Sequence, residues 1–104
     1  MQPQFKTPQV NDEAELLCPR CKSDYLHHFR VDVFERSEDQ PSGIHVTVEN
    51  GRATSDTEMA GNPSSRRHGL AIHFECEHCQ TESVFQIAQH KGNTLVTFLS
   101  KSET

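Results

Sequence analysis

The sequence lacks the long hydrophobic runs that membrane-spanning and signal segments require. Hydrophobic residues make up only 33% of the 104 residues, and no apolar stretch approaches transmembrane length. The N-terminal segment MQPQFKTPQV also has no apolar core of the kind that secretory signals carry. We therefore expect one small domain in the reducing cytoplasm, without a membrane partner.

Little of the chain is apolar enough to build a hydrophobic core. Two segments are mainly polar: 1–13, which we expect to be a disordered tail, and 51–68, which we expect to be a flexible inserted loop. The domain itself is predicted to span 14–100. Without the two segments roughly 70 residues remain, and at that size apolar burial gives only a small margin over chain entropy. Such a domain commonly needs a disulfide or metal crosslink.

The sequence also lacks an excess of positive charge and the usual motifs of enzymes. Ten Lys and Arg residues against 15 Asp and Glu residues give a net charge of −5, whereas non-specific binding to nucleic acid depends on neutralising phosphates. There is no glycine-rich phosphate loop, and no serine has a base at motif spacing. We therefore predict a protein without catalytic residues and without a small-molecule substrate.

The four cysteines are present as two Cys-x-x-Cys pairs, CPRC at Cys18 and Cys21 and CEHC at Cys76 and Cys79. Two residues between thiols let both sulfurs of a tight turn approach one ion, and two such turns complete a tetrahedron. Disulfide bonds are the competing chemistry, but they need an oxidising compartment. A thioredoxin-type redox site would need a βαβ context, which we do not find. We predict one structural Zn²⁺ with all four cysteines as ligands.

Alternation of apolar and polar residues predicts five strands and no helix. Three strands lie between the cysteine pairs, around Phe29–Val33, Ile44–Val48 and Leu70–Phe74. A hairpin follows the second pair, with strands Glu82–Gln89 and Thr94–Leu99 joined by a turn at residues 90–93. The predicted fold class is therefore all-β, with the strands in an antiparallel arrangement.

The two Cys-x-x-Cys turns, each joined directly to a predicted strand, resemble the two knuckles of the zinc-ribbon superfamily. The resemblance covers about Leu16 to Leu99, and the chain as a whole is similar to small uncharacterised bacterial zinc-ribbon proteins of unassigned function. It implies a small metal-stabilised antiparallel zinc ribbon. The segment between Cys21 and Cys76 is longer than in compact ribbons, so we expect an elongated or inserted β-hairpin there.

The histidines suggest a second site. If strands 44–49 and 70–75 pair with His45 opposite His73, and the preceding strand places Asp32 beside His45, the three residues form a row on the outer face. Such a row is typical of a metal site or an acid–base group. Polar residues also alternate outward on any half-buried strand, so both interpretations stay open. Three further histidines near the cysteines could replace a cysteine as a ligand, but four thiolates make that unnecessary, so they are expected to donate hydrogen bonds near the thiolates or to face solvent: His27, His28 and His78.

A positive cluster is expected at one end of the ribbon. Arg66 and Arg67 lie at the C-terminal base of segment 51–68, Arg52 lies at its other end, and Lys91 lies in the hairpin turn. Guanidinium groups can bind phosphates or carboxylates, although a charged loop without a specific role has the same composition. We expect a non-enzymatic structural-zinc module that binds another macromolecule. A protein is the expected partner, and nucleic acid bound through Arg66 and Arg67 is the alternative.

Overall fold

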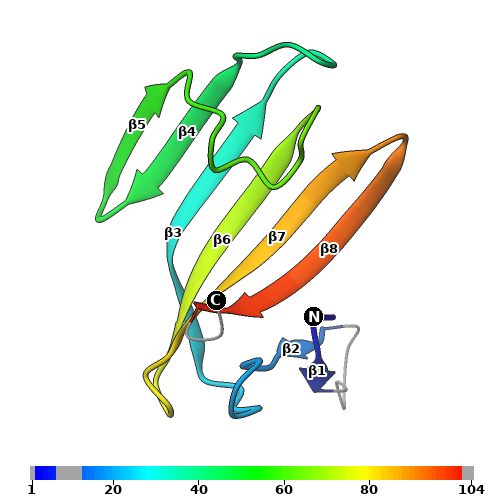
Figure 1. The fold of residues 1–104 in the computed structure, drawn as a ribbon. Helices are drawn as coiled ribbons and strands as arrows, with labels where there is room; N and C mark the ends of the chain where they lie inside the picture. Colours follow the sequence, from blue (N-terminus) through cyan, green and yellow to red (C-terminus); the bar gives the residue numbers. More distant parts are fainter. Residues whose placement is uncertain (1, 7–12, 102–104) are drawn as a thin grey trace.

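The fold is built from β-strands. The computed structural model describes residues 2–6 and 13–101, and within them it has eight strands and no α-helix. The strands are β1 (Phe5–Lys6), β2 (Glu15–Leu16), β3 (Leu26–Glu35), β4 (Ile44–Glu49), β5 (Arg52–Asp56), β6 (Gly69–Cys76), β7 (Glu82–His90) and β8 (Asn93–Ser100). β1 and β2 form a small separate sheet, and the other six form one antiparallel sheet in the order β5-β4-β3-β6-β7-β8 (Figure 1). The predicted all-β fold class is confirmed.

Five of these strands lie where the sequence pattern predicts them, and three do not. β3, β4, β6, β7 and β8 match the predicted strands. β1 and β2 have two residues each, which is too short to show a period. β5 has the sequence RATSD, with Ala53 as its one apolar residue, and it pairs with β4 along its whole length. Segment 51–68, predicted as a loop, therefore begins with a strand.

A tight turn explains why β5 forms. Asn50 and Gly51, the two residues between β4 and β5, have φ values of 54° and 75°. Two consecutive positive φ values are what a two-residue β-hairpin turn requires, and Asn-Gly is the residue pair best suited to them. The turn therefore directs the chain back along β4.

The predicted tail is described only in part. Residues 1 and 7–12 lie outside the described residues, whereas Phe5 and Lys6 pair with Leu16 and Glu15 to form the small sheet. The assignment of 1–13 as a disordered tail and of 14–100 as the domain stays a prediction.

The predicted strand order was wrong at one place. β4 was expected to pair with β6, but β3 lies between them and pairs with both. Within the β3–β4 pair the register also differs from the predicted one, because Asp32 lies opposite Thr47 rather than His45. The reason is β5: it occupies the far edge of β4, so residues 57–68 must cross β4 and β3 before β6 begins (Figure 1).

The register of the sheet sorts its side chains into two chemically different faces. On one face, two rows of directly paired residues cross all six strands, and every member but Ser55 is apolar: Ala53, Val48, Val31, Ile72, Phe85 and Phe98, then Ser55, Val46, Val33, Leu70, Ile87 and Val96. We call this the apolar face. The row between them points to the opposite side and consists of Thr54, Thr47, Asp32, Ala71, Gln86 and Thr97. We call that side the polar face.

In most sheets the apolar face is the buried one, but in this sheet more side chains are buried on the polar face. On the polar face Asp32, Phe34, Ala71 and Val84 are buried, whereas in the two apolar rows only Phe98 is buried. Part of the cover on the polar face comes from the crossing segment, since a Cβ on Gly61 would lie 3.5 Å from the Phe34 ring. The small core of the domain thus lies mainly under segment 57–68 and beside the cysteines.

Candidate metal centre and polar cluster

Both cysteine pairs lie in turns of the same local structure. In the first turn the amide of Cys18 donates to the carbonyl of Ser23 (2.8 Å), and the amide of Lys22 donates to the carbonyl of Cys18 (3.0 Å). The second turn repeats these bonds at the same spacing, from Cys76 to Thr81 (3.2 Å) and from Gln80 to Cys76 (2.9 Å). The two turns are therefore structural equivalents.

The residue after each second cysteine has the same unusual backbone conformation. Lys22 and Gln80 have φ values of 65° and 58°, although neither is glycine. The positive φ turns the chain away from the cysteines and into the following segment. A third amide bond, from Glu77 to the carbonyl of Tyr25 (3.0 Å), holds the two turns against each other.

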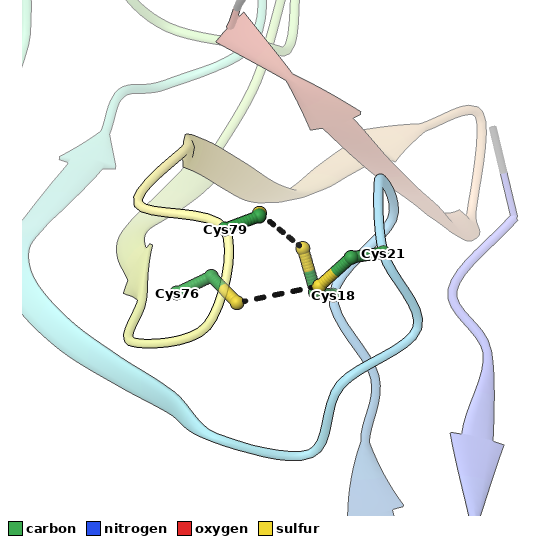
Figure 2. A group of neighbouring side chains, drawn as sticks. All are labelled: Cys18, Cys21, Cys76 and Cys79. Carbon is green, nitrogen blue, oxygen red and sulfur yellow. Dashed lines mark hydrogen bonds between the residues drawn. The ribbon is translucent and has the colours of Figure 1, made fainter.

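The four sulfur atoms have the spacing of a tetrahedral metal site. The sulfurs of Cys18 and Cys79 are 3.7 Å apart, those of Cys21 and Cys76 are 3.6 Å apart, and all four lie within 4.8 Å of one another (Figure 2). A zinc ion with four thiolates at about 2.3 Å requires sulfurs about 3.8 Å apart. A disulfide would need about 2.05 Å, and the cysteines are free thiols. The residues present fit a four-coordinate metal ion.

The thiols influence one another's pKa values. The backbone amide of Ser23 favours the Cys21 thiolate, but burial and the three neighbouring thiols outweigh it and raise the pKa of Cys21 to about 12. Hydrogen bonding by Thr81 is the main factor that lowers the pKa of Cys79 to about 6. Burial raises the pKa of Cys18. A divalent cation would remove this conflict, because it binds all four sulfurs as thiolates.

The nearby histidines do not join the cysteine cluster. Within the described residues, the one group of three or more His, Cys, Asp or Glu residues placed to hold a metal consists of the four cysteines. His27 lies 3.0 Å from a carboxylate oxygen of Glu77, and His28 contacts the edge of the Phe74 ring. His27, His28 and His78 are exposed.

Asp32, His45 and His73 do come together, although through a different pairing from the predicted one. Because β3 lies between β4 and β6, Asp32 lies between His45 on β4 and His73 on β6. Nε2 of His45 is 2.8 Å from one carboxylate oxygen of Asp32, and Nε2 of His73 is 3.0 Å from the other. The row was placed on an outer, solvent-facing side; in the structure Asp32 is only 4% exposed.

Two further side chains complete the coordination of the buried carboxylate. Arg30 donates to both oxygens of Asp32 from Nε and Nη2 (3.0 and 3.1 Å), and the Thr47 hydroxyl donates to one of them (2.9 Å). Burial alone would raise the pKa of Asp32, but the bonds from Arg30, His45 and Thr47 outweigh it and hold that pKa well below its ordinary value. The carboxylate is thus a buried anion whose lone pairs are all used.

The two histidines of this cluster have different protonation. Both ring nitrogens of His45 face carboxylates, Asp32 and Asp56 (2.9 Å from Nδ1), so both must carry hydrogens. Burial opposes the charge, but these bonds prevail and raise the pKa of His45. Burial is the main factor that lowers the pKa of His73. Neutral His73 donates from Nε2, which leaves its buried Nδ1 without a partner.

The positively charged residues predicted to bind a partner do not form one cluster. Arg66, Arg67 and Lys91 line one small depression together with Glu38 and His90. Arg52 lies elsewhere, directly opposite Glu49 and next to the β4–β5 turn. Figure 1 places that turn and the β7–β8 turn at opposite ends of the sheet.

Acidic residues neutralise two of the arginines. Arg66 forms a two-pronged ion pair with Asp39, with a distance of 2.7 Å from Nη2 to Oδ2, and Arg67 lies 3.9 Å from a Glu38 oxygen. The depression therefore carries mixed charge rather than the positive field that a phosphate backbone attracts. Sequence reasoning missed these pairs because Glu38 and Asp39 lie in the loop after β3.

Comparison of the chain with family models, with curated proteins and with solved structures finds no match. Among the described residues there is also no helix long and apolar enough to cross a membrane. The metal site, the polar cluster and the two sheet faces are therefore the basis on which a function is proposed.

Proposed function

We propose that this chain is a cytoplasmic, non-enzymatic zinc-ribbon module that binds another protein. One Zn²⁺ held by Cys18, Cys21, Cys76 and Cys79 would join the β2–β3 connection to the β6–β7 connection. Zinc with four thiolate ligands has no open position for a water or substrate. The metal would therefore stabilise the fold and take no part in chemistry.

The observation that carries the binding role is the exposed apolar face. It spans all six strands of the sheet, and Ile44 and Val48 on β4 are 58% and 47% exposed. Contiguous apolar patches of more than a few hundred Å² on a soluble protein mark sites that bind proteins or other apolar surfaces. Nucleic acid, by contrast, would require positive charge, and the chain carries a net charge of −5.

Titration of the zinc-loaded protein with short single- and double-stranded nucleic acids would separate these alternatives. We expect no saturable change in the amide NMR spectrum at low or moderate salt. Shifts confined to residues near Arg66, Arg67 and Lys91, which fade with salt and disappear in the double variant Arg66→Ala and Arg67→Ala, would establish the nucleic-acid function instead.

A second measurement addresses the zinc role directly. Metal analysis of the purified protein should give one zinc per chain, and removal by a chelator under reducing conditions should unfold it. A chelated protein that keeps its full amide dispersion would exclude a structural role for the metal.

A further inference from the structure

We propose that the apolar face is the dimer interface of this protein: two copies pack their sheets face to face about a twofold axis and form a β-sandwich. This inference rests on the proposed function, since it names the protein that the module binds. A sheet with one hydrophobic face must bury that face against another layer. Figure 1 shows the six strands side by side, with β1 and β2 beyond the lower end of β8 rather than across the sheet, so among the described residues no strand lies over the apolar face.

The size of the face suits a sheet better than a helix. Six strands about 4.8 Å apart, with about seven paired residues each, make a surface of roughly 25 Å by 25 Å, which is on the order of 600 Å². A stable interface of standard size buries about 800 Å² per partner. A single helix is about 10–12 Å wide and would leave more than half of the face exposed. A second six-stranded sheet, stacked about 10 Å away, would cover all of it.

Charge also favours a second copy. The two apolar rows contain no charged residue, and Glu35 lies at the margin, opposite Ile44 at the end of β4. Two negatively charged chains would therefore meet through surfaces whose two central rows are neutral, with Glu35 at the edge of the contact. A basic partner, in contrast, would find no carboxylate within the rows to pair with.

The face has a projection and a hollow that complement each other. Val48 and Ile44 on β4 are its most exposed apolar side chains. A depression of about 270 Å³ lies between β3, β6 and β7. Val33, Leu70 and Ile87 form its apolar lining, and Glu35, His68 and Gln89 lie at its polar side. In a twofold arrangement the same surface serves both copies, so β4 of each copy can enter the hollow of the other.

A matched pair of substitutions tests the interface. Val48→Lys places a charge on the apolar face, and Leu95→Lys places the same charge on the polar face, at positions that are 47% and 48% exposed. Analytical ultracentrifugation of the zinc-loaded full chain should give a dimer, with twice the 11.8 kDa mass of one chain. Val48→Lys should weaken dimerisation about 100-fold or more, because a lysine would be buried unpaired, and Leu95→Lys should leave it unchanged. Zinc content and the amide spectrum would verify that both variants fold.

Should Val48→Lys fail to fold, Ile44→Lys at the more exposed end of β4 would replace it. Added salt should preserve or strengthen the dimer, since it screens the net negative charge and leaves apolar contacts intact.

A dimer that Leu95→Lys disrupts and Val48→Lys does not would place the interface elsewhere and overturn the inference. A wild-type protein that stays monomeric would overturn it too. If that monomer binds another protein and Val48→Lys abolishes the binding, the proposed function survives; if it binds none, both fail.

Discussion

The two halves of the large sheet are held together by different chemistry. At one end, four thiols from two equivalent turns meet at the spacing of a zinc site, whereas near the other end Arg30, Asp32 and His45 form a buried ionic cluster. The cysteine turns bring together the connections before β3 and after β6, and the ionic cluster joins β3 to both β4 and β6. The difference is that the four cysteines could hold an ion from solution, while the ionic cluster is complete within the chain. The metal end should therefore respond to chelators and the cluster end to pH.

The largest effect is expected at the metal end. Cys76→Ser removes a buried ligand, and the loss of metal binding should abolish folding, since structural zinc contributes about 10 kcal/mol or more and a domain is stable by only about 5–15 kcal/mol. Zinc content together with amide NMR dispersion checks this outcome. His78→Ala, between the cysteines but exposed, is the control and should keep both. A folded, zinc-loaded Cys76→Ser protein would contradict the four-thiolate assignment.

A smaller but substantial effect is expected at the cluster end. Asp32→Asn removes the buried anion that Arg30 and His45 surround, and the loss should be about 3–5 kcal/mol because their charge remains without compensation. Urea unfolding of the zinc-loaded protein measures it. Asp56→Asn is the matched control: this carboxylate also bonds His45 but is exposed, so its loss should be much smaller. Equal effects of the two substitutions would show that the cluster does not act through burial.

The two ends also differ in how well the sequence predicts them. The cysteine turns could be predicted because a tetrahedral metal site commonly takes two pairs of cysteines with two residues between the members of each pair. CPRC and CEHC have that spacing. The grouping of Asp32, His45 and His73 depends on strand order. It was predicted from a pairing that does not exist, and it forms because β3 rather than β6 lies beside β4.

The turn at Asn50 and Gly51 carried a signal that would have corrected that order. An Asn-Gly pair after an alternating strand predicts a hairpin, and β5 is that hairpin's second strand. Thr47 could not have been assigned to the cluster, because only the register places it beside Asp32. Arg30 lies two residues before Asp32 on the same strand, so alternation alone already placed the two side chains on one face. The exposure of the apolar face is a property of the whole sheet and shows in no local pattern.

The pH dependence of stability should show the contribution of His45. Its pKa is raised in the folded protein above the ordinary value of 6.5, so protonated His45 stabilises the fold fully below pH 6.5. That contribution is lost as pH rises through the folded pKa. The difference in free energy of unfolding between wild type and His45→Gln should therefore shrink as pH rises from 6.5. A difference that stays constant or grows with pH would contradict a charged His45.

The smallest effect is expected where ion pairs are exposed. Arg66→Ala breaks the ion pair with Asp39. Both side chains are exposed, so water solvates the charge that remains. The thermal unfolding midpoint of the zinc-loaded protein should stay within the error of calorimetry. A clear decrease would mean that the ion pair between Arg66 and Asp39 stabilises the fold.

Titration of zinc into the reduced, metal-free protein, followed by amide NMR, tests the central claim most directly. We predict a spectrum without dispersion before zinc is added, a dispersed spectrum that grows in proportion to zinc, and an end point at one equivalent per chain. A protein that is already folded without metal would contradict the claim, and so would an end point at two equivalents.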